Sequence, residues 1–287
     1  MPGDRSGGPL GLAAPHDMKS LLASTLLLAI LASGMGFREW LLSSILYQPD
    51  NDFVLTPEEL EIEAEELRIA TEDGIRIQAY WLSFEQTDRS LLFLHGNAGN
   101  ASHRLENADM LRKMGTNVLL LEYRGYGRSE GSVSENGLYA DARAGIEYLV
   151  KQRGIPENRI ILFGRSLGGA VAVDVAQDRD LAGVILESSF SSLSDAAASL
   201  VGLPIGWLAS GLYDSISKIG RVRAPLLFFH GDRDEIIRYR VGQRLFEAAP
   251  EPKQFVTLKG AHHNDTVSVG GTDYARRIER FIHEVAP

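Results

Sequence analysis

Short runs of consecutive apolar residues recur along the chain from about residue 67 onward, separated by turn residues and amphipathic stretches. Runs such as LLFL at 91–94 and VLLL at 118–121 are typical of strands that are buried on both faces of a parallel sheet. The predicted strands are Leu67–Thr71, Ile75–Phe84, Ser90–Leu94, Asn117–Glu122, Arg159–Phe163, Gly183–Leu186, Pro225–Phe229 and Gln254–Leu258. The first two flank the turn signal Glu72-Asp73-Gly74, which favours an antiparallel hairpin.

Amphipathic stretches lie between most of these strands and predict helices. They cover Ser102–Met114, Glu135–Arg153, Ser166 to about Gln177, and about Thr272–Val285. A hairpin followed by alternating strands and helices indicates the α/β class, with a mostly parallel eight-stranded sheet and helices on both faces. Residues 190–220 are rich in apolar side chains but lack a strand pattern. We expect them to form a short helical cap insertion over the carboxyl ends of the strands.

An uncharged and strongly apolar segment precedes this body. The 18 residues from 20 to 37 hold no charged side chain, and apolar residues continue to Tyr47. Because a helix of about 20 apolar residues spans the hydrocarbon core, residues 20–47 predict a single-pass membrane anchor, with the body of the chain on the extracytoplasmic side. Two other interpretations stay open. The segment is a signal peptide cleaved near Ala32-Ser33-Gly34, or an apolar helix that packs on the domain.

Two polar stretches flank the predicted anchor. Residues 1–19 are rich in Pro, Gly and polar side chains and are expected to form a disordered leader. Residues 48–66 carry eight acidic side chains and no Lys or Arg, which predicts an acidic linker. The folded domain is then expected to span residues 67–287. Since every motif that could carry chemistry lies beyond Leu94, a chain that begins near Asp52 should keep its activity.

Charge and composition exclude several classes of function. The net charge is −9, but residues 1–66 hold eleven acids and three bases, so the remaining body has 26 bases and 27 acids. A nearly neutral body without a basic stripe argues against a nucleic-acid partner. The absence of cysteine excludes disulfides, thiolate catalysis and zinc–cysteine sites. We expect no metal or organic cofactor, and the composition leaves the oligomeric state open.

The strongest chemical signal is residues 164–169, GRSLGG, which join a predicted strand to a predicted helix. A G-x-S-x-G segment in that context is typical of a nucleophile elbow, a strained turn that projects the serine from the top of the sheet. Glycines on both sides let the strand and the helix approach closely. The pattern predicts that Ser166 is the nucleophile, placed at a helix N-terminus that favours developing negative charge.

A serine needs a general base, and the base needs an acid that orients it. In chains with this type of elbow the order along the sequence is Ser, acid, His. The candidate acids follow the strand that ends at Phe229, and the candidate bases lie further on. The acids are Asp232, Asp234 and Glu235, and the bases are His262, His263 and His283. Each group of candidates except His283 falls on a loop that follows a strand, so we expect the site at one edge of the sheet.

The site also requires donors for the oxyanion. The N–H after the nucleophile belongs to Leu167, and a second N–H is expected from the loop after the third strand, at Asn97. His95 ends that buried strand and precedes Ser166 in the chain. The chain order therefore favours a structural role for His95.

Taken together, the motifs resemble those of the α/β-hydrolase superfamily. The combination HGNAGN, EYRGYGRSEG, GRSLGG, YDSISKI, HGDRDEII and GAHHND over residues 45–285 is similar to one subset. This subset comprises the membrane-anchored serine hydrolases related to serine aminopeptidase-like hydrolases and to eukaryotic protein depalmitoylases. The chain departs from the pattern at Glu122, where the family usually has Asp, and at Arg238-Tyr239, which replace a common Pro-Phe.

The resemblance implies an α/β-hydrolase fold and selects among the open candidates. It implies that the triad is Ser166, Asp234 and His263, because the family places the acid at the third position after HG and the histidine directly before Asn-Asp. It also implies an esterase-like or thioesterase-like activity on a small-molecule or acylated substrate. Two alternatives remain, a peptidase of the serine aminopeptidase type and a non-catalytic, membrane-tethered binding protein.

Overall fold

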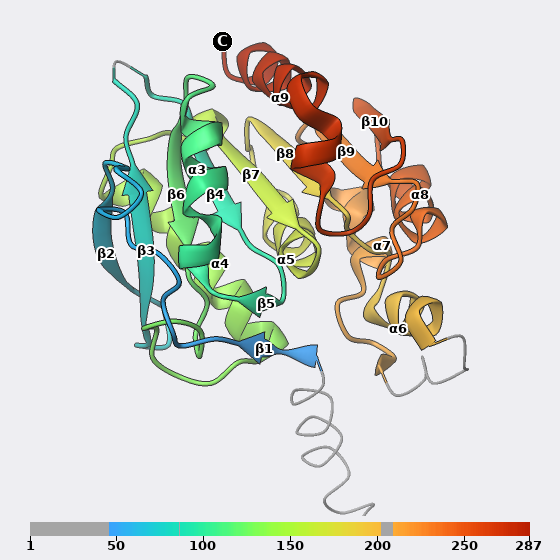
Figure 1. Cartoon of the computed structure of the whole chain (residues 1–287), viewed down its shortest axis with the longest axis horizontal. Helices are drawn as coiled ribbons and strands as arrows, with labels where there is room; N and C mark the ends of the chain where they lie inside the picture. Colours follow the sequence, from blue (N-terminus) through green and yellow to red (C-terminus); the bar gives the residue numbers. More distant parts are fainter. Residues whose placement is uncertain (1–45, 86, 202–208) are drawn as a thin grey trace, which may run out of the picture. The chain divides into compact units, whose positions relative to one another are not determined.

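A computed structural model of the chain describes residues 46–85, 87–201 and 209–287. Its main sheet has eight strands, in the order β10-β9-β8-β7-β4-β6-β3-β2 (Figure 1). The strands are β2 (Glu65–Ala70), β3 (Arg76–Leu82), β4 (Ser90–Leu94), β6 (Asn117–Leu121), β7 (Ile160–Arg165), β8 (Gly183–Glu187), β9 (Leu226–Gly231) and β10 (Lys253–Leu258). The first predicted pair forms the antiparallel hairpin β2–β3, and β3 is also antiparallel to β6. All other neighbours are parallel, which confirms the mostly parallel eight-stranded sheet.

Helices cover both faces of the sheet, as predicted. Helices α3 (Leu105–Arg112) and α9 (Thr266–Val285) lie on one face, and α4 (Glu135–Lys151), α5 (Leu167–Ala176) and α8 (Tyr239–Ala248) lie on the other (Figure 1). Each face has its own apolar core. Every residue of β4, β6, β7, β8 and β9 is buried. Their continuous apolar runs therefore belong to strands that are buried on both faces, as predicted.

Two helices differ from the prediction. Helix α8 was not predicted at all, and only Val241, Gly242 and Leu245 of its residues are buried. Helix α9 begins at Thr266, earlier than expected, and is kinked at Gly271, where φ is 50° and ψ is −137°. A positive φ of this kind is readily adopted by glycine. The kink at Gly271 separates two helical segments, and the sequence pattern predicted only the second of them.

The predicted cap insertion consists of short helices. It contains α6 (Leu193–Val201), α7 (Ser215–Lys218) and the 3₁₀ helix η4 (Ile219–Arg221). Helix α6 lies toward the same end of the sheet as β5 (Ala98–Gly99), which follows the carboxyl end of β4 (Figure 1). The remaining insertion residues, 202–208 with Trp207, lie outside the described residues.

A second, two-stranded sheet pairs β1 (Gln48–Pro49) in parallel with β5. Neither strand was predicted, because each has only two residues and no apolar pattern. Strand β1 lies within the stretch that we predicted to be an acidic linker. The proposed division into a leader, residues 1–19, an anchor, 20–47, a linker, 48–66, and a domain, 67–287, stays a prediction.

We predicted a single-pass membrane protein with an extracytoplasmic domain. Judged by the helices that the structure describes, this prediction is wrong. Within residues 46–85, 87–201 and 209–287, no helix is both long and apolar enough to cross a bilayer. Even α9, with 20 residues, carries Asp273, Arg276 and Arg277 on its polar side, and its apolar stripe packs on the sheet. The predicted anchor itself, residues 20–47, lies outside the described residues except for its last two.

Candidate active site

Ser166 stands in the sharp turn between β7 and α5. Its φ of 52° and ψ of −115° are unusual for a residue with a side chain, and it is the N-cap residue of α5. Its main-chain N–H donates to the carbonyl of Glu187, at 2.8 Å, which fixes the turn to the end of β8. The predicted elbow geometry is therefore present, with the hydroxyl half-buried at the end of the sheet.

The glycines around Ser166 are required by close backbone contacts. A Cβ atom on Gly168 would lie 2.0 Å from the carbonyl oxygen of Leu94, and one on Gly164 would lie 2.5 Å from the carbonyl oxygen of Gly168. A Cβ on Gly169 would lie 2.2 Å from the hydroxyl of Ser189. Since none of these positions has room for a methyl group, the glycines let α5 pack directly against β4 and β7.

His263 and Asp234 complete a chain of hydrogen bonds that starts at Ser166. His263 follows β10, and its Nε2 atom lies 3.1 Å from Ser166 Oγ. Its Nδ1 atom lies 2.8 Å from Oδ2 of Asp234, on the loop after β9. Both side chains are buried. Three loops at the same edge of the sheet thus bring together the serine, histidine and aspartate that the sequence singled out, while their catalytic roles stay a prediction.

The carboxylate of Asp234 is held by the main chain of its own loop. Its Oδ1 atom accepts hydrogen bonds from the N–H groups of Ile236, at 3.0 Å, and Ile237, at 2.7 Å. This leaves Oδ2 for His263. His230 lies 3.4 Å from the same oxygen and donates from Nε2 to the carbonyl of Ile237, at 2.8 Å. Burial lowers the pKa of His230, which favours its neutral form beside the aspartate.

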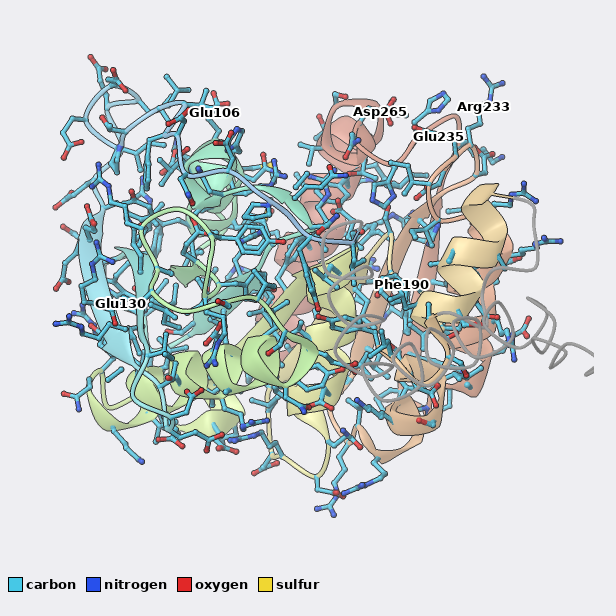
Figure 2. The ribbon with its side chains drawn as sticks, turned by 90° about the horizontal axis from the view of Figure 1, so that it is seen from below. Glu106, Glu130, Phe190, Arg233, Glu235 and Asp265 are labelled. Atoms are coloured by element: carbon cyan, nitrogen blue, oxygen red, sulfur yellow. The ribbon has the colours of Figure 1, made fainter. Side chains whose placement is uncertain are left out.

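The other acid and base candidates contact groups other than Ser166 Oγ. Asp232 accepts a hydrogen bond from the N–H of Gly260, at 2.6 Å. His262 faces Glu235, at 2.9 Å, on the exposed side of the two loops. Figure 2 shows Glu235 on the loop after β9 near Asp265 on the loop after β10. Hydrogen bonds, first with its own main chain and then with His262, lower the pKa of Glu235. His283 contacts Arg89.

A buried ion pair beside the elbow was not predicted. Arg165, the residue before Ser166, lies 3.1 Å from Glu187 at the end of β8, and its guanidinium donates to the carbonyl of His263, at 3.1 Å. Glu187 also accepts hydrogen bonds from the hydroxyls of Thr266, at 2.7 Å, and Tyr274. Burial raises the pKa of Tyr274 well above its usual range. The only sequence signal was a charged residue at the end of each of two apolar runs.

The loop after β4 passes directly over the elbow. A Cβ on Gly96 would lie 3.5 Å from the Cβ of Ser166, so the beginning of the loop lies beside Ser166. Asn97 is half-buried there, and its carbonyl accepts a hydrogen bond from the hydroxyl of Tyr126, at 2.8 Å. Leu167 is the first residue of α5. Leu167 therefore follows Ser166 directly, and Asn97 follows Gly96, which lies beside Ser166. The role of their N–H groups in binding an oxyanion stays a prediction.

His95 lies below this loop and contacts acceptors with both ring nitrogens. Nδ1 donates to the carbonyl of Gly96, at 2.7 Å, and Nε2 lies 3.0 Å from Oε1 of Glu122. The histidine and the glutamate are fully buried. The other oxygen of Glu122 accepts a hydrogen bond from the N–H of Ala101, at 2.7 Å. His95 is thus engaged in holding the loop, as the chain order indicated.

Known proteins match most of the chain. The family model described as serine aminopeptidase, S33, matches residues 85–217. The protein Rv2307c of Mycobacterium tuberculosis is 36% identical over 264 residues, which cover 91% of this chain and 94% of that protein. The alpha/beta hydrolase domain-containing protein WAV2 of Arabidopsis thaliana is 32% identical over 258 residues, covering 82% of this chain and 83% of WAV2.

A solved structure has the same fold. The esterase Pf2001 of Pyrococcus furiosus superposes with a TM-score of 0.72 at 22% identity, covering 83% of this chain and 98% of the esterase. Together with the strand order described above, this match confirms the architecture that the motifs implied.

Proposed function

The chain belongs to the α/β-hydrolase superfamily and is a hydrolase of that superfamily, and we propose that it is a serine hydrolase that cleaves carboxyl esters or thioesters through an acyl-enzyme. The observation that carries this proposal is the continuous chain of contacts from Ser166 Oγ through His263 to Asp234, at 3.1 and 2.8 Å. Serine, histidine and aspartate in this geometry form a nucleophile, its base and the group that orients the base.

The first half-reaction makes the acyl-enzyme. Nδ1 of His263 donates to the Asp234 carboxylate, so Nε2 is the unprotonated nitrogen that faces Ser166. Ser166 Oγ attacks the carbonyl carbon of the substrate and its proton passes to Nε2. The tetrahedral intermediate collapses as Nε2 returns the proton to the leaving alcohol or thiol. The Asp234 carboxylate stabilises the imidazolium that exists between the two transfers.

The second half-reaction releases the acid. A water molecule enters in place of the leaving group, gives a proton to His263 Nε2 and attacks the acyl carbon. The collapse of the second tetrahedral intermediate returns the proton to Ser166 Oγ and frees the carboxylic acid. In both steps the negative oxygen is stabilised by the N–H of Leu167, at the N-terminus of α5, and by the N–H of Asn97.

A peptidase activity is the second candidate, and the serine aminopeptidase family model over residues 85–217 is the observation that favours it. Peptide hydrolysis would use the same three side chains, but it must protonate an amine leaving group. The two activities are separated by a panel of p-nitrophenyl esters, acyl thioesters and aminoacyl p-nitroanilides. We expect higher kcat/KM for the esters and thioesters, and the reverse order would favour the peptidase.

The catalytic proposal is tested by Ser166→Ala. The alanine variant should fold normally and lose turnover by about 10⁶-fold, since removal of a triad serine has an effect of this size. It should also lose covalent labelling by a fluorophosphonate, which the parent protein should show at one site. Turnover above about a hundredth of the parent rate in the folded variant would contradict the proposal.

A further inference from the structure

The segment Gln48–Asp52 runs alongside the loop that carries Asn97. Strand β1 pairs with β5 in the register Gln48↔Ala98 and Pro49↔Gly99. The N–H of Asp50 continues this pairing and donates to the carbonyl of Gly99, at 3.2 Å. The loop from residue 95 to residue 100, called the oxyanion loop below, therefore has main-chain contacts with a segment that lies about fifty residues earlier in the chain.

Asn100 joins this segment to the oxyanion loop. It is fully buried, and its Nδ2 atom donates to the carbonyls of Asp50, at 2.9 Å, and Asp52, at 2.8 Å. Its Oδ1 atom accepts from the N–H of Ser102, at 2.9 Å, and from the hydroxyl of Ser102, at 2.6 Å. Both donors and both acceptor sites of the amide are used. The NH₂ half binds the N-terminal segment, and the oxygen half caps the turn that follows the loop.

The loop after β6 ties the same two segments together. The N–H of Gly127 donates to the carbonyl of Asp50, at 3.1 Å. The hydroxyl of the neighbouring Tyr126 donates to the carbonyl of Asn97, at 2.8 Å. Tyr47, just before β1, also contacts Tyr213 of the cap insertion through their hydroxyl groups, at 2.7 Å. The segment is thus fixed on two sides while it holds the oxyanion loop.

We propose that the segment Gln48–Asp52 holds the oxyanion loop in its working position and that Asn100 is the positioning residue through which it acts. The inference rests on the proposed function. An oxyanion donor must lie about 2.7–3.1 Å from the developing negative charge. A displacement of about 1 Å is enough to lower the rate about 100-fold. In the main sheet, β4 fixes the beginning of this loop but not its end. The end of the loop, β5, pairs with β1 instead of with the main sheet.

The test is Asn100→Asp in the full-length chain. Aspartate has the same shape and keeps the oxygen that accepts from Ser102, but it replaces the NH₂ group that binds Asp50 and Asp52. A carboxylate oxygen would then face two carbonyl oxygens without a proton between them, which favours separation of the segment from the loop.

Asn117→Asp is the matched control. Asn117 is also buried, its Nδ2 donates to the carbonyls of Thr87 and Arg89, both at 3.1 Å, and its Oδ1 accepts from the N–H of Phe84, at 2.8 Å. It therefore loses the same kind of hydrogen bonds. It is the first residue of β6, at the end of the parallel strands opposite to Ser166.

The readouts are kcat, KM and inhibitor affinity per folded molecule with an ester substrate. In Asn100→Asp we expect kcat to fall about 10–100-fold, with KM within about threefold and the acid limb of the kcat/KM–pH profile unchanged, because His263 and Asp234 are untouched. A trifluoromethyl ketone, whose adduct carries an oxyanion, should lose affinity in proportion to kcat. Asn117→Asp should keep the parent kcat. Asn100→Ala, which removes the donors to Asp50 and Asp52 without placing a negative charge beside their carbonyls, should lower kcat in the same direction and serves if Asn100→Asp does not fold.

Two results would overturn the inference. One is a parent-like kcat in folded Asn100→Asp, or in Asn100→Ala where that variant replaces it. The other is an equal loss of kcat in Asn117→Asp. Either result leaves the proposed function standing as long as Ser166→Ala is inactive. Full turnover by Ser166→Ala would instead refute the proposed function itself.

Discussion

Replacing Ser166 with glycine and, separately, with alanine should show that the elbow stores backbone strain. Both changes remove the hydroxyl that contacts His263, at 3.1 Å, so they remove the proposed nucleophile equally. They differ only in the Cβ atom. Alanine keeps a Cβ at φ 52° and ψ −115°, a conformation that side chains disfavour, whereas glycine adopts it without steric cost.

The expected difference follows from two opposing terms. A residue with a side chain in a sparsely populated backbone conformation costs about 1–3 kcal/mol of stability. Glycine has a more flexible unfolded chain, which costs about 0.5–1 kcal/mol relative to alanine. Ser166→Gly should therefore be more stable than Ser166→Ala by about 1 kcal/mol. For a domain of this size, that difference corresponds to about 2–4 °C in Tm.

The assay is thermal and urea unfolding of the two variants under identical conditions. The control pair is Ser217→Gly and Ser217→Ala, at an exposed position in α7 where both lose the hydroxyl contact with the Asp214 carbonyl. There the sign should reverse, with glycine about 1 kcal/mol less stable than alanine. If glycine is also the less stable residue at 166, the strain argument is refuted.

Three further predictions concern the neighbours of the nucleophile. Asp234→Asn should lower kcat by about 10⁴-fold because it disturbs the tautomer of the proposed base, whereas Asp232→Asn should leave kcat within about tenfold. If steady-state kinetics show a larger loss in Asp232→Asn, the acid is misassigned. His263→Ala should lower kcat by several orders of magnitude and His262→Ala by about tenfold or less, and equal losses in the two folded variants would leave the base unassigned. Burial lowers the pKa of His230, so the unfolded state takes up the proton at a higher pH than the folded state does. The free energy of unfolding should therefore fall as the pH drops below about 6.5, and this part of the fall should vanish in His230→Gln. An unchanged profile of unfolding free energy against pH in that variant would contradict the prediction.

The strands of the main sheet could be predicted because their signal is local. Each buried strand is a continuous apolar run, and all predicted bounds agree with the structure to within two residues. Helix α8 could not be found in the same way, since Gly242 interrupts its apolar stripe. That glycine is needed because a Cβ there would lie 2.2 Å from Nδ1 of His230, a contact that only the folded chain reveals.

The candidate site was predictable as far as chain order allows. The elbow at Ser166 follows from a local motif, but the choice of Asp234 and His263 came from a resemblance, because adjacent loop residues give no signal of which side chain faces inward. The Arg165–Glu187 pair required knowledge that β7 and β8 are neighbours in the sheet. The expectation that a chain beginning near Asp52 keeps its activity stays a prediction, and such a chain would lack the contacts that Asp50 makes with Gly99, Asn100 and Gly127. A two-residue strand formed by distant partners leaves no periodic pattern.

The strand order also sets when the protein becomes competent during its synthesis. Strands β7, β8, β9 and β10 are successive neighbours in the sheet, so each newly made strand joins the edge left by the one before it. Folding that proceeds from the N-terminus therefore builds the elbow first and the loop of Asp234 later. The proposed base comes last of the three side chains, because His263 follows β10 at the sheet edge. An unfinished chain with an assembled elbow thus holds a serine hydroxyl without its proposed base, and the three side chains come together only after β10 has been made.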